Sequence, residues 1–393
     1  MGENRFLTVF NDFEAVHLHK DVGAIPYHLA TVCGWRSSLA FFEKREGMAE
    51  ELAGTEYAKT VSLVSLGRWS GRFLNAARIV KFIATHGREY DVAQFYHDGV
   101  VTLLYALLYK FARPGGVVYL KLDMSHLELQ RILELGTMAV PRTLRRLKHL
   151  LSRLAVDLYT AETAYTCGRL AGNEYFRGRL HFLPNGFTYD GGSEAQEYLA
   201  GKENIILTVG RLGDPAKYNE VLVDAASALD PDIVDGWNVY FVGPVVNEQF
   251  RSYAEEAIRR KPHLKDVFVF TGNVEDRGKL YEIYRKSRIF CMTSRWESFG
   301  FVYLEAMYFG NYVISSDLPA PRELTQDGAF GSLFPVGDVP ALAGLISDAI
   351  SGKIDVTRGG MESQRIIRER YDWRIIVREL DRLLGEAAMR LRG

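Results

Sequence analysis

Short apolar runs alternate with longer helix-like stretches along this chain, and this alternation restricts the fold more than any other feature. The second half carries the clearer runs, at 205–209, 239–242, 267–270, 289–292 and 312–315. The first half repeats the pattern less regularly, at 6–10, 61–66, 92–96, 117–122, 157–161 and 180–184. Parallel strands joined by crossover helices produce such alternation. The sequence therefore predicts an α/β protein with two doubly wound domains.

The length of the chain agrees with two domains. A chain of 393 residues exceeds one ordinary core, so two domains of roughly 180 residues are expected. The Gly-rich, polar segment 185–204 is typical of a linker, and we place the boundary near Asp190. We predict domains over 1–189 and 190–371 and an amphipathic helix over 372–393 that packs back on the first domain.

Composition excludes several classes of protein. Lys and Arg number 48 against 49 Asp and Glu, so no overall charge favours nucleic acid as a partner. The isolated Cys33, Cys167 and Cys291 indicate neither disulfides nor zinc and favour a reducing compartment. Neither a signal region nor an apolar stretch of ~18 residues occurs, so we expect a cytoplasmic protein.

Two further patterns argue against metal and redox cofactors. Asp230-Pro231-Asp232 has the D-x-D form of a metal site, but it lies in turn-forming company, so we interpret it as a turn. No G-x-G-x-x-G follows the first strand of either domain, which disfavours a nicotinamide or flavin enzyme. We therefore expect no cofactor and no metal.

The residues after the fourth strand of the second domain form the most informative segment. Residues 294–298 are a loop at the carboxyl end of a strand, and Ser298 is expected to cap a helix that starts near Phe299. The N–H groups of 298–301 and the positive helix end would bind negative charge, and Gly300 lets a ligand approach the backbone. The segment predicts a phosphate site.

Two glutamates flank this helix start. Glu297 lies in the loop, and Glu305 lies about two turns further along. Their carboxylates would accept hydrogen bonds from hydroxyls at two points of one ligand, such as a sugar and a ribose on either side of a diphosphate. The alternative is a capped amphipathic helix with two surface glutamates.

A second loop points to the same ligand. Arg211 and Lys217 follow the first strand of the second domain on a loop that begins at Gly210. Two cations on a loop that leads into a helix suit a diphosphate and would stabilise it as it departs. The alternative is a pair of solvated cations, although positive charge at a helix start is mildly unfavourable.

The pattern Glu-x7-Glu with Phe-Gly after the first Glu, followed by a glycine and a strand, resembles the donor-site signature of the retaining GT4-type glycosyltransferases (glycosyl transferases group 1). The resemblance implies the GT-B fold, in which two Rossmann-like domains face a central cleft. It implies that Glu297 binds the transferred sugar and Glu305 the nucleotide ribose. It also implies that the backbone of Phe299, Gly300 and Phe301 lies at the sugar and phosphates.

Two other segments of the second domain fit this family. Gly210, Arg211 and Lys217 match its phosphate-binding loop, except that Tyr218-Asn219 replaces the usual glycine after the lysine, which questions the local turn. The turn 272–274 occupies the place that lies against the nucleotide base in this family. Asn273 and Val274 are therefore expected to contact the donor.

The first domain resembles the family more faintly. Segment 19–32 stands where the family has its first glycine-containing loop and helix, which implies that Gly23 lies near the donor phosphates. Many relatives carry a His at the strand end 117–126, where this chain has Lys121-Leu122-Asp123. We expect Asp123 either to line the cleft as a catalytic group or to cap a helix.

Residues 142–154 form a basic amphipathic pattern with leucines at 144, 147, 151 and 154 and five cations without an acid between them. Such a helix suits the surface of an anionic membrane. The alternative is a solvated face whose leucines pack on the first sheet, and the two interpretations are compatible.

The sequence thus predicts a metal-independent, retaining hexosyltransferase. It would move a sugar from a UDP- or GDP-linked donor to a hydroxyl of a glycan or lipid-linked glycan, in bacterial surface polysaccharide biosynthesis. Its place would be the cytoplasm or the inner face of the plasma membrane. The alternatives are a nucleotide-sugar epimerase of the same fold and a non-catalytic nucleotide-sugar-binding protein.

Overall fold

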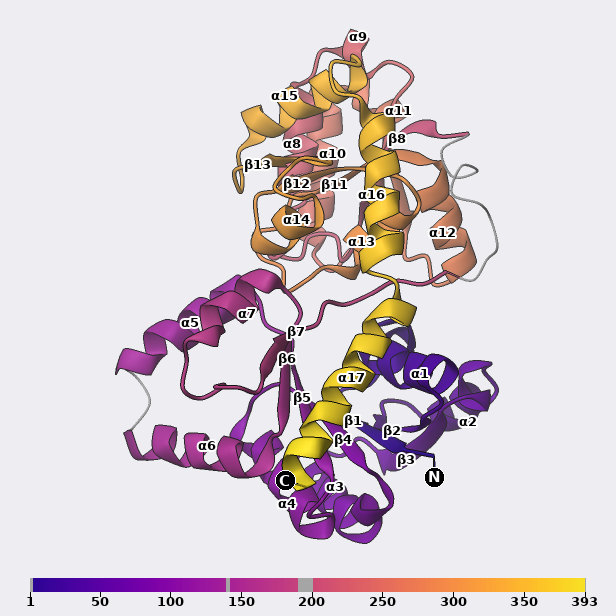
Figure 1. Cartoon of the computed structure of the whole chain (residues 1–393). Coiled ribbons are helices and arrows are strands. Elements are labelled where there is room, and N and C mark those ends of the chain that lie inside the picture. Colours follow the sequence, from indigo (N-terminus) through magenta and orange to yellow (C-terminus); the bar gives the residue numbers. More distant parts are fainter. Residues whose placement is uncertain (1–2, 139–141, 190–200, 393) are drawn as a thin grey trace. The chain divides into compact units, whose positions relative to one another are not determined.

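A computed structural model describes residues 3–138, 142–189 and 201–392 (Figure 1). The chain divides into two compact units. The first contains Met1–Gly186 and Trp373–Gly393, and the second contains Phe187–Asp372. The predicted boundary at Asp190 lies outside the described residues.

The first unit is built on a parallel sheet of seven strands in the order β3-β2-β1-β4-β5-β6-β7. Because the order reverses between β1 and β4, the crossovers lead to opposite edges of the sheet, as in a doubly wound fold. The strands are β1 (Arg5–Phe10), β2 (Arg36–Glu43), β3 (Ser62–Arg68), β4 (Val92–Tyr96), β5 (Val117–Leu122), β6 (Leu158–Ala161) and β7 (Leu180–Phe182).

Helices connect these strands. They are α1 (Asp21–Cys33), α2 (Met48–Ala53), α3 (Arg72–His86), α4 (Val100–Ala112), α5 (His126–Met138), α6 (Arg142–Ala155) and α7 (Ala164–Ala171), with short helical turns η1 (Ala15–His19), η2 (Tyr57–Lys59) and η3 (Gly87–Glu89). Their apolar faces form a core with the sheet in which β4 and β5 are buried along their whole length. Strands buried on both faces are typical of a sheet covered by helices on each side.

The second unit repeats this architecture with a parallel sheet of six strands in the order β10-β9-β8-β11-β12-β13. The strands are β8 (Glu203–Val209), β9 (Asn238–Val242), β10 (Phe268–Gly272), β11 (Ser287–Met292), β12 (Tyr312–Ser316) and β13 (Gly331–Phe334). The helices are α8 (Glu220–Ala228), α9 (Pro231–Val234), α10 (Glu248–Arg260), α11 (Leu264–Val267), α12 (Arg277–Lys286), α13 (Phe301–Tyr308), α14 (Pro319–Leu324), α15 (Val339–Ile350) and α16 (Val356–Arg370).

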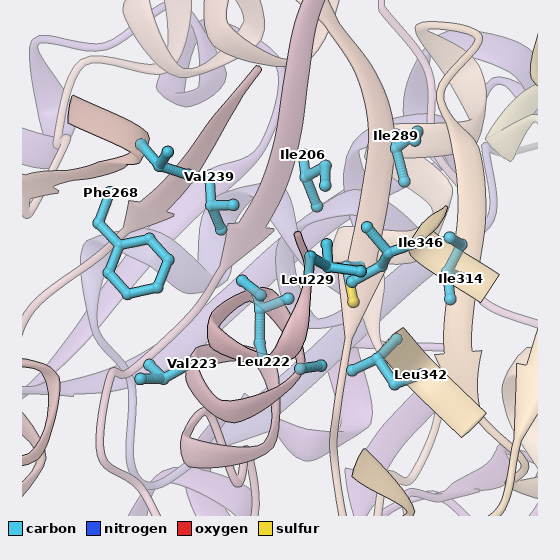
Figure 2. Close-up of a cluster of buried hydrophobic side chains, with 14 of the residues drawn as sticks. Ile206, Leu222, Val223, Leu229, Val239, Phe268, Ile289, Ile314, Leu342 and Ile346 are labelled. Atoms are coloured by element: carbon cyan, nitrogen blue, oxygen red, sulfur yellow. The ribbon is translucent and has the colours of Figure 1, made fainter. Parts of the chain in front are cut away.

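A buried cluster between the sheet and helices α8 and α15 forms one face of the second core (Figure 2). Branched side chains of alternate strand positions point to this face, and leucines and isoleucines of the helices meet them; they include Ile206, Ile289, Ile314, Leu222, Leu342 and Ile346. The other face is covered by α13 and α16, and its core includes Leu207, Phe290, Leu304 and Ile367. The sheet thus holds the loops at its carboxyl edge in fixed positions.

The C-terminal helix α17 (Trp373–Arg392) belongs to the first unit, where it packs against α1. The indole N–H of Trp35 donates a 2.7 Å hydrogen bond to Asp381 Oδ1. The buried side of α17 consists of Trp373, Ile376, Val377, Leu380, Leu383, Leu384 and Ala387. The prediction that this helix packs back on the first domain is confirmed.

The predicted fold class is confirmed in both units, but β2 and β13 were not predicted. Only two residues separate β2 from the end of α1, so its apolar run continues the helical pattern before it, and β13 has only four residues. The left-handed Gly34, with φ of 74°, ends α1 and separates it from β2. Within the described residues, no helix is long and apolar enough to cross a membrane.

Candidate active site

The second unit brings Lys217 and Glu297 together, 80 residues apart in sequence. Lys217 follows β8 and Glu297 follows β11, and these neighbouring parallel strands end at the same edge of the sheet. The ammonium group of Lys217 pairs with Glu297 Oε1, to which Ser294 Oγ also donates at 2.7 Å. Only 18% of the Lys217 side chain and 9% of the Glu297 side chain are exposed, so both charges are held in place rather than solvated.

Two further contacts hold these loops against each other. Thr293 Oγ1 lies 3.0 and 2.9 Å from the carbonyl oxygens of Lys217 and Tyr218. The backbone N–H of Arg295 donates to the carbonyl of Ala216 at 2.8 Å. The loop after β11 therefore fixes the position of Lys217 through its backbone as well as its side chain.

Tyr218, which replaces the usual glycine, adopts the left-handed conformation that favours glycine, with φ of 46°. The guanidinium of Arg295 lies 3.6 Å from the centroid of its ring. The stacked ring offsets part of the steric cost of this conformation, which is about 1–2 kcal/mol for a residue with a Cβ. The tight turn is therefore kept although tyrosine stands at this position instead of glycine.

Arg211 lies apart from this ion pair. Its guanidinium donates to Asp214 Oδ2 at 2.6 Å, and 65% of its side chain is exposed. Asp214 Oδ1 in turn accepts from the backbone N–H of Ala216 at 2.9 Å, which braces the loop. Sequence reasoning missed Asp214, although a carboxylate three residues after Arg211 was a readable signal.

The structure corrects the predicted start of the helix after β11. α13 begins at Phe301 with Gly300 as its N-cap, and no side chain caps it, so the prediction that Ser298 caps the helix is wrong. Gly300 takes φ of 84°, and the ring of Phe299 is buried in the core, which draws residues 298–300 out of the helix. A Cβ at Gly300 would lie 2.7 Å from the ring of Tyr303.

Glu305 lies in α13 with both carboxylate oxygens engaged. Arg277, the first residue of α12, donates to Oε1, and the hydroxyl of Tyr284 donates to Oε2 at 2.9 Å. Burial alone would lower the pKa of Arg277, but the charge of Glu305 outweighs it and raises that pKa. Arg277 is a site residue that sequence reasoning missed, because its link to Glu305 is tertiary.

Asn273 and Val274 follow β10 on the loop that leads to Arg277. Asn273 is exposed, and its amide donates to Glu275 Oε1 at 3.3 Å. Val274 is partly buried and packs against the core that contains Phe309. This loop therefore presents one polar and one apolar side chain near the Arg277–Glu305 pair.

In the first unit, Gly23 lies in the first turn of α1 rather than in a loop. A Cβ there would lie 2.4 Å from the carbonyl oxygen of Leu18, so the glycine permits η1 to pack against α1. Asp123 follows β5 and is exposed. It does not cap α5, because Ser125 and Glu128 form the capping hydrogen bonds there.

The structure also bears on the predictions for Asp230 and for the basic helix α6. Asp230 caps the short helix α9 by accepting from the N–H of Asp232, at a place where a turn was predicted. In α6 the leucine stripe divides: Leu151 is buried in the first core, whereas Leu147 and Leu154 are about half exposed. The side chain of Leu144 lies outside the described residues.

Comparisons with known proteins bear on the family and the fold of this chain. Residues 193–370 match the family model of the glycosyl transferases group 1. The phosphatidyl-myo-inositol mannosyltransferase of Mycobacterium leprae (strain TN) is 33% identical over 210 residues, which cover 52% of this chain and 53% of that protein. The chain thus matches about half the length of its curated relatives.

Solved structures resemble the whole chain. Anabaena Alr3699/HepE in complex with UDP and glucose superposes with a TM-score of 0.71 at 18% identity, covering 98% of this chain and 100% of that one. The sucrose-phosphate synthase of Thermosynechococcus elongatus gives a TM-score of 0.71 at 17% identity, covering 98% and 99%. At this identity the likeness concerns the fold.

Residues 193–370 therefore match the glycosyl transferases group 1, and the chain has the GT-B fold of glycosyltransferases. The family and the fold that the motifs predicted are confirmed.

Proposed function

We propose that this protein transfers a sugar from a nucleotide-diphosphate sugar to a hydroxyl of a glycan or lipid-linked glycan. The observation that carries the proposal is the pairing of Lys217 with Glu297 at the carboxyl edge of the second sheet. Ligands of open α/β sheets bind at this edge. The ammonium of Lys217 can bind a diphosphate, and the carboxylate of Glu297 can accept hydrogen bonds from sugar hydroxyls. A bound donor would therefore replace the ion pair between the two side chains.

The other residues of the second unit receive roles by position. Arg211 and Lys217 stabilise the departing diphosphate, and the N–H groups of 298–301 at the positive start of α13 bind its oxygens. Glu305 accepts from the ribose, with Asn273 and Val274 at the base. Because cations perform the charge stabilisation, we propose a reaction without metal or other cofactor.

The reaction exchanges one bond for another at the anomeric carbon. The bond from that carbon to the diphosphate oxygen breaks, a bond to the acceptor oxygen forms on the same face, and the acceptor proton passes to the departing phosphate oxygen. Asp123 contacts the acceptor or the sugar. Retention and a hexose donor follow from the family resemblance, and the relatives named for mannose and for UDP with glucose support UDP- or GDP-linked hexoses.

Transfer assays with Lys217→Ala and Glu297→Ala test this function. UDP-glucose and GDP-mannose serve as donors, with phosphatidylinositol and water as acceptors. Each variant is expected to lower the transfer rate about 100-fold, because each removes a group that acts on the charged transition state. Lys353→Ala and Glu369→Ala remove exposed charges of the same unit and serve as controls.

The outcomes separate three functions. Site variants with rates within a few fold of wild type contradict the proposed roles. A new nucleotide sugar formed without acceptor indicates the epimerase. Binding of a nucleotide sugar with neither transfer nor hydrolysis of that donor indicates a non-catalytic nucleotide-sugar-binding protein.

The exposed leucines of α6 support a second proposal, that this helix contacts an anionic membrane. Leu147, Leu150 and Leu154 are each about half exposed beside the exposed Arg146 and Arg153. Such a combination suits the headgroup region of a bilayer. The protein would then act in the cytoplasm at the inner face of the plasma membrane, and a role in bacterial surface polysaccharide biosynthesis stays a prediction.

Sedimentation with lipid vesicles tests the membrane contact. Each cation near an anionic surface contributes about 1 kcal/mol, so Arg146→Gln with Arg153→Gln is expected to weaken binding to vesicles that contain phosphatidylglycerol about 30-fold. Arg251→Gln with Arg259→Gln removes two exposed cations of the second unit and is the control. Equal binding of both double variants would contradict the proposal.

A further inference from the structure

A small cavity lies at the amino edge of the second sheet, opposite the edge that holds Lys217 and Glu297. β8 and β11 are neighbouring parallel strands, so their first residues meet at this edge. A strand rises about 3.3 Å per residue, so the seven residues of β8 put roughly 20 Å between the two edges. We call this space the Lys202 cavity. Its lining comes from β8, β11, α13 and α16 and consists of Gly201, Lys202, Arg288, Gly310, Val356 and Thr357.

Two cations line the cavity, and no acidic side chain is among the lining residues. Lys202 Nζ donates to the carbonyl oxygens of Phe309 at 2.6 Å and Tyr284 at 3.4 Å. Arg288 Nη2 donates to the carbonyl of Lys202 at 3.0 Å, and its guanidinium carbon lies 5.9 Å from the centroid of the Trp237 ring. In the described part of the chain, neutral groups alone therefore hold the two cations in place.

Hydrogen-bond donors of both cations lack strong acceptors. Arg288 Nε is buried and has no hydrogen-bond partner among the described residues. An ammonium has three N–H donors, and Lys202 meets two carbonyls, one of them at 3.4 Å, which is long for a hydrogen bond. Because a buried donor without an acceptor is costly, the cavity is suited to a ligand that accepts hydrogen bonds.

The titration of Lys202 agrees with this missing counter-charge. Burial, followed by the charge of Arg288, lowers the pKa of Lys202 to about 7, and no acid acts on it among the described residues. The acids closest in sequence have other partners: Glu203 lies 3.5 Å from Lys286, and Asp355 caps the start of α16. A bound anion would favour the charged amine and raise this pKa.

The start of α16 adds to the positive potential of the cavity. α16 has 15 residues, and Val356 and Thr357 are the first two. The first N–H groups of a helix lack partners within the helix, and its start carries about half a positive charge. Thr357 is exposed and therefore stands at the mouth of the cavity. The helix start thus strengthens a field that Lys202 and Arg288 already create.

The size of the cavity limits the ligand. Its volume is about 160 Å³. A water molecule takes about 30 Å³ of the liquid, so the cavity has room for about five groups of that size. A tetrahedral oxyanion, with one central atom and four oxygens, fits this space, whereas the organic part of a phosphate ester would extend past Thr357 into solvent.

We propose that the Lys202 cavity binds a doubly charged tetrahedral oxyanion, which is sulfate, phosphate or the phosphoryl group of a phosphate monoester. Lys202 Nζ and Arg288 Nε donate to its oxygens, and the start of α16 lines the same space. The anion supplies the counter-charge that the two cations lack and thereby stabilises the second unit. This site lies apart from the donor edge and does not depend on the proposed sugar transfer.

Calorimetric titration of the full chain with sodium sulfate at pH 6.5 and pH 8 tests the site. Sulfate keeps its charge over this range, so protons taken up on binding go to the protein. Because the amine of Lys202 is largely neutral at pH 8, uptake is expected to approach one proton per sulfate there and to be smaller at pH 6.5, where binding is tighter. Titration with inorganic phosphate and with glycerol 3-phosphate distinguishes a free anion from an ester, and the tighter ligand identifies the preferred form.

Variants of three lining residues locate the bound anion. Lys202→Met and Arg288→Met each remove a charged donor and are expected to weaken sulfate binding at pH 6.5 about 10- to 100-fold. Lys286→Met, at an exposed lysine paired with Glu203, is their control. Thr357→Glu places a carboxylate at the mouth of the cavity and is expected to weaken binding at least about 10-fold. Glutamate is favourable in the first turn of a helix, so this variant should stay folded, and Thr357→Gln is its uncharged match.

Sulfate could also bind the cations of the donor edge, so the titrations are repeated in the double variant Arg211→Ala with Lys217→Ala. Retained binding in that variant, together with weaker binding in Thr357→Glu, assigns the anion to the Lys202 cavity whether or not the protein transfers a sugar. The inference is overturned if the wild type binds none of the three anions, or if the donor-edge variant loses the binding. Equal affinity in Thr357→Glu and Thr357→Gln, or sulfate binding at pH 8 without proton uptake, overturns it as well.

Discussion

Lys202, the residue before β8, carries an amine that is largely removed from water. Its Nζ donates to the carbonyl of Phe309 at 2.6 Å, and burial followed by the charge of Arg288 lowers its pKa to about 7. In the unfolded chain the pKa returns to its ordinary value of 10.5. The unfolded state therefore binds more protons between these two values, and the free energy of unfolding rises with pH across that window.

The resulting prediction concerns stability between pH 7 and 9. The free energy of unfolding is expected to rise by up to about 1.4 kcal/mol per pH unit in the wild type, and Lys202→Met should remove this rise. Urea unfolding at pH 7, 8 and 9 measures the effect, with Lys353→Met as a control at an exposed lysine. If the free energy of unfolding changed with pH equally in the wild type and in Lys202→Met, the amine of Lys202 would have an ordinary pKa.

Residues of the candidate site differ in how far sequence can predict them. Lys217 and Glu297 follow neighbouring strands, so strand order alone places them at one edge. Arg277 meets Glu305 only because α12 and α13 pack together, which no local pattern reveals.

Among the elements, α13 shows why helix starts are harder to predict than helices. Ser298 is a good N-cap on intrinsic grounds, and the sequence predicts a start near it. The burial of Phe299 and the left-handed backbone of Gly300 move the start to Phe301. Tertiary packing therefore overrides a local preference worth about 1 kcal/mol.

This geometry yields a prediction for Gly300→Ala. The variant is expected to lose about 1–2 kcal/mol of unfolding free energy, because φ of 84° is unfavourable for alanine and its Cβ would press on Tyr303. Binding of UDP or GDP should weaken as well, because the start of α13 must shift. Thermal unfolding and calorimetry measure the two effects.

Gly344→Ala is the matched control. Gly344 lies inside α15, is exposed, and a Cβ there would meet nothing within 4 Å. Alanine is favoured over glycine in a helix interior by about 1 kcal/mol, so this variant should be stabilised with unchanged nucleotide binding. A lower unfolding free energy in Gly300→Ala and a higher one in Gly344→Ala would assign the loss to the backbone of Gly300. A change of the same sign in both variants would refute that assignment.

At the scale of the whole molecule, the first unit is discontinuous in sequence, because the second unit is inserted between its two segments. Residues 1–186 and 373–393 share one core, and the second unit lies between them in sequence. The repeated strand-helix pattern predicts both sheets, because strands buried on two faces give continuous apolar runs. The partner of α17 could be expected only by analogy, since amphipathic periodicity shows that a helix is covered but not by which element.

Deletion of residues 373–393 therefore has a predictable consequence for one unit alone. The deletion uncovers the face of α1 and removes seven buried side chains of α17, each of which contributes about 1–3 kcal/mol. Their sum is comparable to the whole stability of a domain, about 5–15 kcal/mol, so the first unit should unfold or aggregate. The second unit, which is compact by itself, should keep its cooperative unfolding transition and its affinity for UDP or GDP.

Calorimetric scans of the full-length and shortened chains would show one transition lost and one retained. Loss of both transitions would mean that the second unit depends on the first, and retention of both would mean that α17 contributes little to the core it covers.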